Sequence, residues 1–249
     1  MPTRTATLCF LAFAIAISAR ELRAQQPPSL PRPSAADPVP PAESQQTRPA
    51  DVGPTRLFLA PTARSLRRGK GTCALTEIAF PWGEVGLTDR VSVRVFGLPP
   101  LQDVSPGGVA IGPKIQLYGG ARVQAAVGAV QLFSPSQGDY GGIGYGVVTL
   151  GRADVGVTLG YGNGYGGLAG SGGSRGVLFL GAEKALGRSW RLIAEGYVGG
   201  DALGLPDQTL GGGVRFSRRR FSADLGVVVP IYETGSGTPA PLLTIAWAF

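Results

Sequence analysis

From residue 55 to the C-terminus, short segments with large apolar residues at every second position are separated by Gly, Pro, Asn, Asp or Ser. Successive side chains of a β-strand point to opposite faces, so this alternation predicts strands with one apolar face. In the last segment, Leu243, Ile245, Trp247 and Phe249 share one face. The pattern predicts about twelve strands and an all-β fold. The strands are expected to begin near Thr55, Thr72, Arg90, Val109, Ala121, Gly141, Ala153, Arg175, Ser189, Thr209, Phe221 and Pro241.

The connections between these strands alternate in length. Short ones are predicted at residues 82–89, 119–120, 151–152, 187–188 and 218–220, and long ones at 98–108, 133–140, 163–174, 200–208 and 231–240. Transmembrane β-barrels have an even number of antiparallel strands, short periplasmic turns and longer external loops. The alternation therefore predicts an up-and-down barrel that spans the outer membrane, with both ends of the barrel chain on the periplasmic side.

Aromatic residues fall near the predicted strand ends, as expected at the two interfaces of a membrane. One group is assigned to the periplasmic side: Trp82, Tyr118, Trp190, Phe216, Phe221, Trp247 and Phe249. The other group is assigned to the outer side: Phe96, Phe133, Tyr161, Tyr197 and Tyr232. Because a soluble β-sandwich usually buries its aromatics in the middle of strands, this distribution favours the membrane barrel.

The first 54 residues differ in character from the rest. Residues 1–24 combine Arg4, a short apolar stretch and small residues, which predicts a secretory signal peptide. Residues 25–54 are rich in Pro, Gln, Ser and Ala without apolar periodicity, which predicts a disordered periplasmic linker. The predicted organisation is thus a signal at 1–24, a linker at 25–54 and a barrel domain at 55–249.

The composition supports a membrane location without a spanning helix. Charged residues make up 16% of the chain, against about 25% in soluble domains. No apolar run approaches the roughly 18 residues that a spanning helix needs. A closed barrel is the other structure that satisfies its backbone hydrogen bonds in lipid. A soluble periplasmic β-protein stays as the alternative.

Together, the signal peptide, the alternating loops, the aromatic belts and the terminal Phe249 resemble the features of bacterial outer-membrane β-barrel proteins, in particular uncharacterised porin-like ones. The resemblance covers residues 55–249. It implies a Gram-negative outer membrane, contact with outer-membrane lipids, and a C-terminal strand whose Trp247 and Phe249 form a signal for the barrel-assembly machinery.

The sequence offers no convincing catalytic or cofactor site. It contains no His, which removes the usual base of Ser and Cys nucleophiles. Residues 172–176 match Gly-x-Ser-x-Gly, and residues 162–167 match Gly-x-Gly-x-x-Gly, but neither lies at a strand-to-helix turn. We therefore expect no enzyme activity, no cofactor, no metal and no nucleic-acid partner.

Charged residues within the predicted strands are expected to face the barrel interior, because a charge facing lipid at mid-depth costs about 2–4 kcal/mol. Large apolar residues are taken to face lipid, and the opposite positions are then assigned to the lumen. The resulting lumen charges are Arg56, Glu77, Arg94, Lys114, Arg122, Asp154, Glu183, Arg191, Glu195, Arg215 and Asp224. Glycines are also assigned inward, among them Gly144, Gly146, Gly160 and Gly181; they either leave room or relieve curvature and crowding.

Two functions remain open from these charges. If the two signs segregate into opposite walls, the barrel is a small passive pore for small polar solutes. If they pair across the lumen, the barrel is a structural envelope protein, or a barrel that binds ligands or surfaces, with a closed, salt-bridged interior. Twelve strands lie between the roughly eight that side chains fill and the 16 to 18 of open porins. The balanced signs argue against a channel for acidic oligosaccharides, which would be expected to have a more basic lumen.

Overall fold

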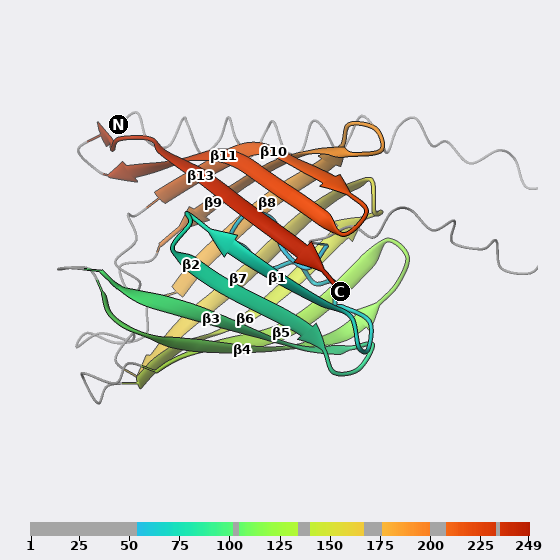
Figure 1. The fold of residues 1–249 in the computed structure, drawn as a ribbon, viewed down its shortest axis with the longest axis horizontal. Coiled ribbons are helices and arrows are strands. Elements are labelled where there is room, and N and C mark those ends of the chain that lie inside the picture. The colour runs from blue at the N-terminus through green and yellow to red at the C-terminus, as the bar shows by residue number, and fades with distance from the viewer. Residues whose placement is uncertain (1–53, 102–104, 134–139, 167–175, 200–207, 233–234) are drawn as a thin grey trace, which may run out of the picture.

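The chain forms a closed antiparallel β-barrel (Figure 1). The computed structural model describes residues 54–101, 105–133, 140–166, 176–199, 208–232 and 235–249. Within them lies one 13-stranded sheet. The two-residue β12 pairs only with β11, so the barrel wall has 13 − 1 = 12 strands. The prediction of an all-β, antiparallel barrel of about twelve strands is therefore confirmed.

The strands run in chain order around the barrel. Their bounds are β1 Gly71–Thr76, β2 Phe80–Gly86, β3 Val91–Leu101, β4 Ser105–Gly119, β5 Val123–Phe133, β6 Tyr140–Gly151, β7 Val155–Gly166, β8 Gly176–Ala185, β9 Trp190–Val198, β10 Gln208–Arg218, β11 Phe221–Tyr232, β12 Gly235–Ser236 and β13 Ala240–Ala248. Each wall strand pairs with its neighbours, and the barrel closes between β1 and β13, where Thr72 lies opposite Ala248.

The two ends of the barrel differ in their connections. At one end, called the tight-turn end, short connections at residues 87–90, 120–122, 152–154, 186–189 and 219–220 join successive strands, and Phe249 exchanges backbone hydrogen bonds with Gly71. At the other end, called the long-loop end, a turn at residues 77–79 joins β1 to β2. The other connections there run through 102–104, 134–139, 167–175, 200–207 and 233–234, which lie outside the described residues.

Side chains alternate between the two faces of the wall. In β7, Gly156, Thr158 and Gly160 are buried, whereas Leu159 and Tyr161 are 51% and 55% exposed on the outer face. The same alternation leaves large aliphatic residues exposed on most wall strands. The barrel therefore has an apolar outside and a mixed, partly charged inside, which is the reverse of a water-soluble protein.

The strand predicted near Thr55 is wrong. Residues 55–64 lie inside the barrel, where Leu57 and Thr62 are fully buried. The wall begins instead at β1, and the segment predicted as one strand from Thr72 is two strands joined by a turn at residues 77–79. Glu77 and Ile78 both have positive φ there. The number of wall strands still equals the predicted twelve. The strand predicted at Thr55 is absent, and β2 occupies a stretch that was predicted to be largely a turn.

The aromatic belts are partly correct. At the tight-turn end, Trp190 lies against Phe216 and Trp247 lies against Phe221, with ring centroids 5.1 and 6.0 Å apart. Trp190 and Trp247 are about half exposed on the outer face. Tyr118 and Phe249 at this end are also exposed, as are Phe133, Tyr161 and Tyr232 from the opposite group. In contrast, Trp82, Phe96 and Tyr197 face the interior, so these three do not belong to a belt.

The described residues include no helix that is long and apolar enough to cross a membrane. The predicted signal peptide at 1–24 and nearly all of the predicted linker at 25–54 lie outside the described residues. Both therefore stay predictions.

Candidate functional site

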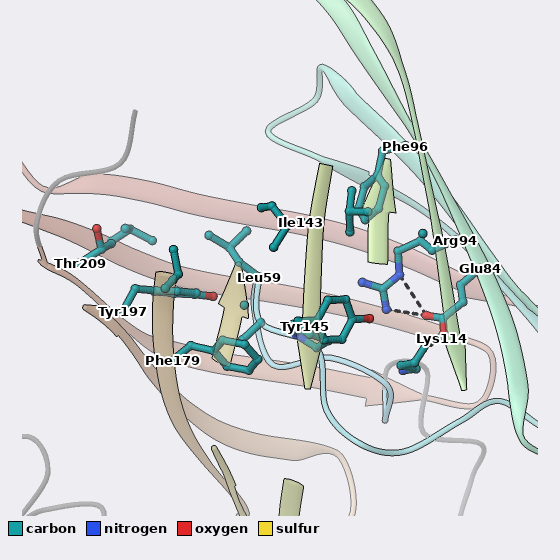
Figure 2. A pocket seen from close by; sticks show the side chains of 17 residues that line it. Leu59, Glu84, Arg94, Phe96, Lys114, Ile143, Tyr145, Phe179, Tyr197 and Thr209 are labelled. Atoms are coloured by element: carbon teal, nitrogen blue, oxygen red, sulfur yellow. Dashed lines mark hydrogen bonds and ion pairs between the residues drawn. The ribbon is translucent and has the colours of Figure 1, made fainter. Parts of the chain in front are cut away.

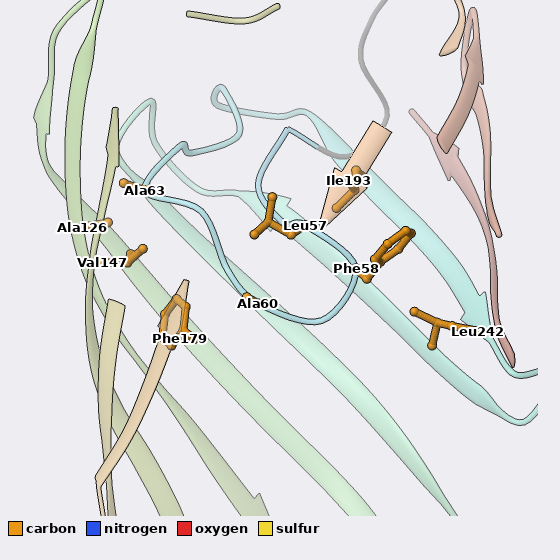
Figure 3. Close-up of a cluster of buried hydrophobic side chains, with 9 residues drawn as sticks. All are labelled: Leu57, Phe58, Ala60, Ala63, Ala126, Val147, Phe179, Ile193 and Leu242. Atoms are coloured by element: carbon orange, nitrogen blue, oxygen red, sulfur yellow. The ribbon is translucent and has the colours of Figure 1, made fainter. Parts of the chain in front are cut away.

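Residues 55–64 form a compact loop within the barrel and are called the plug (Figure 3). The Thr62 N–H donates to the Thr55 carbonyl at 2.9 Å, and the Leu57 N–H donates to the Ala60 carbonyl at 2.8 Å. A bridge between Arg56 and Pro61 lies between these two bonds. The plug is thus a hairpin-like turn whose tip is residues 57–60. Some of its backbone N–H and C=O groups are hydrogen-bonded within the plug, and others bond to the barrel wall.

The tip of the plug is held by one carboxylate. Glu195 on β9 accepts backbone N–H bonds from Phe58, Leu59 and Ala60 at 3.1–3.2 Å. Successive N–H groups of a tight turn converge to form an anion-binding concavity. Glu195 is 1% exposed, and these N–H donors, rather than a cation, are the partners that compensate its burial.

A buried ion cluster holds the other side of the plug. Arg215 on β10 and Asp224 on β11 are fully buried and bond through two N–H donors at 2.7 and 2.9 Å. Asp224 also pairs with Arg56 of the plug at 2.8 Å. Arg215 in turn donates to the Leu57 carbonyl at 2.6 Å. Burial, with Arg215 close by, lowers the pKa of Arg56 to about 10, so Arg56 stays charged at neutral pH.

A second cluster is centred on Glu84 of β2. Its carboxylate accepts bonds from Thr55 at 2.7 Å and from Arg94 Nε on β3 at 3.0 Å. Lys114 on β4 lies 3.7 Å from Glu84 and donates to two plug carbonyls, those of Thr55 and Thr62. The Arg94 guanidinium also lies over Trp82, 5.0 Å from the ring centroid. One carboxylate, two cations and the plug therefore form a single paired network.

A third cluster lies nearer the tight-turn end. Glu183 on β8 pairs with Arg64 of the plug and with Arg191 on β9. Arg64 and Arg191 also donate to carbonyls in the connection between β6 and β7, namely those of Arg152 and Ala153. The three clusters together join the plug to strands on all sides of the barrel. Two further hydrogen bonds add to this: Gln116 donates to the Ala63 carbonyl, and the Ala63 N–H donates to the Thr149 hydroxyl.

Apolar contacts complete the fit of the plug, as Figure 3 shows for Leu57 and Phe58 among wall residues such as Ile193 and Leu242. Glycine makes room for both plug side chains. A Cβ atom at Gly181 would lie 2.0 Å from Leu57 Cδ1, and one at Gly226 would lie 3.1 Å from Phe58 Cζ. The inward glycines at these two positions therefore serve packing rather than an open passage.

Replacing Gly181 tests this fit. We expect Gly181→Val to displace Leu57 and to lower the free energy of unfolding by about 1–3 kcal/mol, the usual cost of overpacking. Urea unfolding followed by gel mobility measures the change. Gly144→Val is the matched control, because a Cβ atom at Gly144 meets nothing within 4 Å. Equal stability of both variants would contradict the packing of the plug against β8.

Beyond the plug tip, towards the long-loop end, the interior contains a cavity of about 290 Å³ (Figure 2). Leu59, Ala60 and Pro61 of the plug form part of its lining. Most of the remaining lining is apolar: Phe96, Val130, Ile143, Tyr145, Val177, Phe179, Tyr197 and Val228. Figure 2 shows Thr209 and Tyr197 at one end of the cavity and the ion network of Glu84, Arg94 and Lys114 at the other.

The structure brings most of the proposed lumen charges to the interior. Arg94, Lys114, Glu183, Arg191, Glu195, Arg215 and Asp224 project inward from wall strands, and Arg56 reaches the interior from the plug. Sequence reasoning missed Glu84 and Arg64. Glu84 lies in a stretch interpreted as a turn, so it was not assigned to the lumen. Arg64 lies at the end of the strand wrongly predicted at Thr55.

Three proposed lumen charges lie elsewhere. Glu77 is exposed in the turn between β1 and β2 and accepts the Leu243 N–H at 2.6 Å. Arg122 is exposed in the connection between β4 and β5, and Asp154 lies in the connection between β6 and β7. These corrections share one cause, because a strand end misplaced by a few residues moves its charge from the wall to a turn.

Among the residues that the structure describes, no group of three or more His, Cys, Asp and Glu side chains could hold a metal ion. The carboxylates of the interior instead bind cations and N–H groups of the protein itself.

The fold, a closed antiparallel barrel with an apolar outer face, is similar to that of porins of known structure. The KdgM porin in complex with disordered oligogalacturonate aligns with a TM-score of 0.51 and 8% identity, over 72% of this chain and 96% of that chain. A second KdgM porin structure aligns with a TM-score of 0.51 and 7% identity, over the same shares. OmpF of Salmonella typhi in complex with daunomycin gives a TM-score of 0.39 at 11% identity, over 69% of this chain and 62% of that chain.

No protein family and no curated protein matches the sequence. At the identities found, the likeness to KdgM concerns the fold alone.

Proposed function

We propose that this chain is an outer-membrane barrel of the porin type whose passage is closed at rest by residues 55–64. The apolar outer face supports the membrane location, since residues such as Leu159 and Leu225 are 51% and 61% exposed there and lipid would cover them. Short turns are periplasmic in such barrels. We therefore place the tight-turn end and the N-terminal tail in the periplasm, and Trp247 and Phe249 where the assembly machinery would recognise them.

The observation that carries the proposal is the set of bonds between plug and wall. Arg215, Glu195 and Lys114, from three different strands, all bond to backbone groups of the plug and are nearly or fully buried. A solute that follows the barrel axis meets this loop and its partners. Conduction therefore requires the plug to leave or to shift, and a permanently open passive pore is not supported.

A second function is favoured by the pairing of the interior charges. Arg215 and Asp224 are both fully buried and directly bonded, and such an ion cluster is costly to separate. A barrel that never opens, and acts as a structural or ligand-binding envelope protein, would have the same arrangement. The two functions differ in one property, because only the gated pore conducts after the plug has been loosened.

Substitution of Glu195, which loosens the plug, distinguishes the gated pore from the permanently closed barrel. We expect the full chain to be almost silent in planar bilayers and Glu195→Ala to produce current steps. Removing the common acceptor of three N–H groups costs about 1–3 kcal/mol, which corresponds to an open fraction roughly 5 to 150 times higher.

Glu77→Ala is the control, because Glu77 is exposed in a turn and does not contact the plug; it should stay as silent as the parent chain. Steady current from the parent chain would overturn the resting closure. Silence of folded, inserted Glu195→Ala would favour the closed structural or binding barrel.

A further inference from the structure

The cavity above the plug has the size and lining of a small-molecule site. Its volume of about 290 Å³ is near the lower limit of typical ligand pockets, about 300–1,000 Å³. Its floor is the plug, with Leu59 half exposed towards the cavity. Its walls come from strands as far apart as β3 and β10. The cavity thus depends on the folded barrel and the seated plug together.

Water is a poor occupant of the middle of this cavity. A buried water needs about two to four polar partners, and the central lining is formed by side chains such as Ile143, Phe179 and Val228. Water there is poorly bound, and displacing poorly ordered water with an apolar group is favourable. The lining therefore favours a ligand with a flat or compact apolar body.

The charged side chains at one end of the cavity are already paired with one another and with the plug, so they do not favour a charged ligand. Arg94 is bonded to Glu84 and stacks on Trp82, and Lys114 is bonded to plug carbonyls and lies near Glu84. An anionic ligand would have to compete with Glu84 for these cations, and a cationic ligand would have to compete with them for Glu84. Because an unpaired buried charge is costly, an uncharged ligand fits better.

The opposite end of the cavity contains a polar atom that points to a ligand. Thr209 on β10 lines the cavity and is 6% exposed, and its Oγ1 atom has no hydrogen-bond partner among the described residues. Buried hydroxyls are normally bonded. Thr209 lies beside Tyr197 at this end (Figure 2). Its Oγ1 atom is itself buried, so a polar group on a ligand reaches it once the Thr209 side chain turns towards the cavity.

We propose that this cavity binds a small, uncharged, mostly aromatic molecule that carries one hydroxyl or carbonyl group, and that Thr209 turns its Oγ1 towards the cavity and hydrogen-bonds to that group. The apolar body lies against Phe179, Val177 and Ile143, above the plug. This inference goes beyond the proposed gating and does not rest on it, because a barrel that never conducts can still hold the ligand.

Isothermal titration calorimetry on the folded full chain in lipid nanodiscs tests the proposal, with empty nanodiscs as the blank for partition into lipid. The probes are 1-naphthol, naphthalene and 1-naphthoate, which share one ring system and differ in their polar group. We expect saturable binding of 1-naphthol with a stoichiometry of one per barrel. Naphthalene should bind about five- to tenfold more weakly, the usual effect of one hydrogen bond, and 1-naphthoate should bind weakest.

Two cavity variants and one control locate the site. Val177→Phe fills the cavity and should weaken 1-naphthol binding at least about tenfold. Val148→Phe makes the same change on the outer face, where Val148 is 40% exposed, and should leave binding unchanged. Thr209→Val removes only the hydroxyl and should reduce 1-naphthol to the affinity of naphthalene. Gel heat-modifiability confirms folding, and Thr209→Val keeps the test decisive if Val177→Phe does not fold.

Non-saturable heat, or equal binding by Val177→Phe and Val148→Phe, would overturn the cavity as the site. Tighter binding of 1-naphthoate than of 1-naphthol would overturn the uncharged class. Unchanged 1-naphthol affinity in Thr209→Val would overturn the role of Thr209. Since none of these measurements involves current, failure here is distinct from failure of the gating proposal.

Discussion

A chain that lacks residues 55–64 is expected to conduct ions in planar bilayers, whereas the full chain is expected to be almost silent. The deletion removes the loop that fills the interior between Glu195, Arg215 and Lys114, and water then solvates these charged side chains. Twelve-stranded barrels lie between the roughly eight strands that side chains fill and the 16 to 18 strands of open channels. The contents of the barrel therefore decide whether it conducts.

The deletion joins Pro54 to Ser65. The two arms of the plug already lie side by side, since the Thr62 hydroxyl donates to the Pro54 carbonyl at 2.6 Å. Deleting residues 35–44, which removes an equal length from the Pro-rich segment, serves as the control and should stay silent. If both deletions are folded and equally silent, residues 55–64 are not the barrier.

The second large effect is expected at Asp224. Asp224→Asn removes the negative charge shared by Arg56 and Arg215, at 2.8 and 2.7 Å, and leaves two guanidinium groups buried side by side. Breaking a buried ion pair from one side costs about 3–5 kcal/mol. We therefore expect the free energy of unfolding in urea, followed by gel mobility, to fall by that amount.

Asp89→Asn is the control for this substitution, because Asp89 is exposed in the β2–β3 connection and accepts one N–H bond from Arg68. It should cost about 1 kcal/mol or less. Equal, small effects of the two substitutions would mean that Asp224 is not the counter-charge of a buried cluster.

The barrel itself could be predicted from the sequence, because a wall strand with an apolar outer face and a mixed inner face has a strict two-residue period. Two neighbouring strands, β11 and β13, show why: Leu225 and Ile245 are exposed on the outer face, while the preceding residues Asp224 and Thr244 are buried inside. Eleven of the twelve predicted strand starts fall within four residues of the start of a strand in the structure. The exception, near Thr55, is the plug, and the segment that begins near Thr72 contains the strand pair β1–β2.

The plug could not be recognised by periodicity. Residues 55–64 have a short apolar stretch, residues 57–61, between polar ones, and most of them are buried, whether polar or apolar. Thr55 bonds to Glu84, whereas Leu57 lies close to Gly181. A loop surrounded on all sides by wall residues makes both polar and apolar contacts, so its composition resembles that of a wall strand although its backbone is not one.

The orientation of the β6 side chains is a second feature that the sequence did not predict correctly. Assigning large residues to lipid placed Gly144 and Gly146 inside. The structure instead turns Ile143 and Tyr145 into the cavity and leaves a Cβ atom at Gly144 or Gly146 in open space. A strand that lines an apolar cavity has large residues on its inner face, so hydrophobicity alone does not define its orientation, and a shift by one residue exchanges the faces.

The most direct test of the plugged interior is thiol labelling of folded barrels at Thr62. Thr62→Cys and Arg68→Cys are made in a chain whose Cys9 and Cys73 are replaced by Ser. Thr62 is fully buried in the plug, whereas Arg68 is exposed close to the start of β1. The structure predicts that a water-soluble maleimide labels Arg68→Cys at once and labels Thr62→Cys only after unfolding. Equally fast labelling of both in folded protein would contradict a plug held inside the barrel.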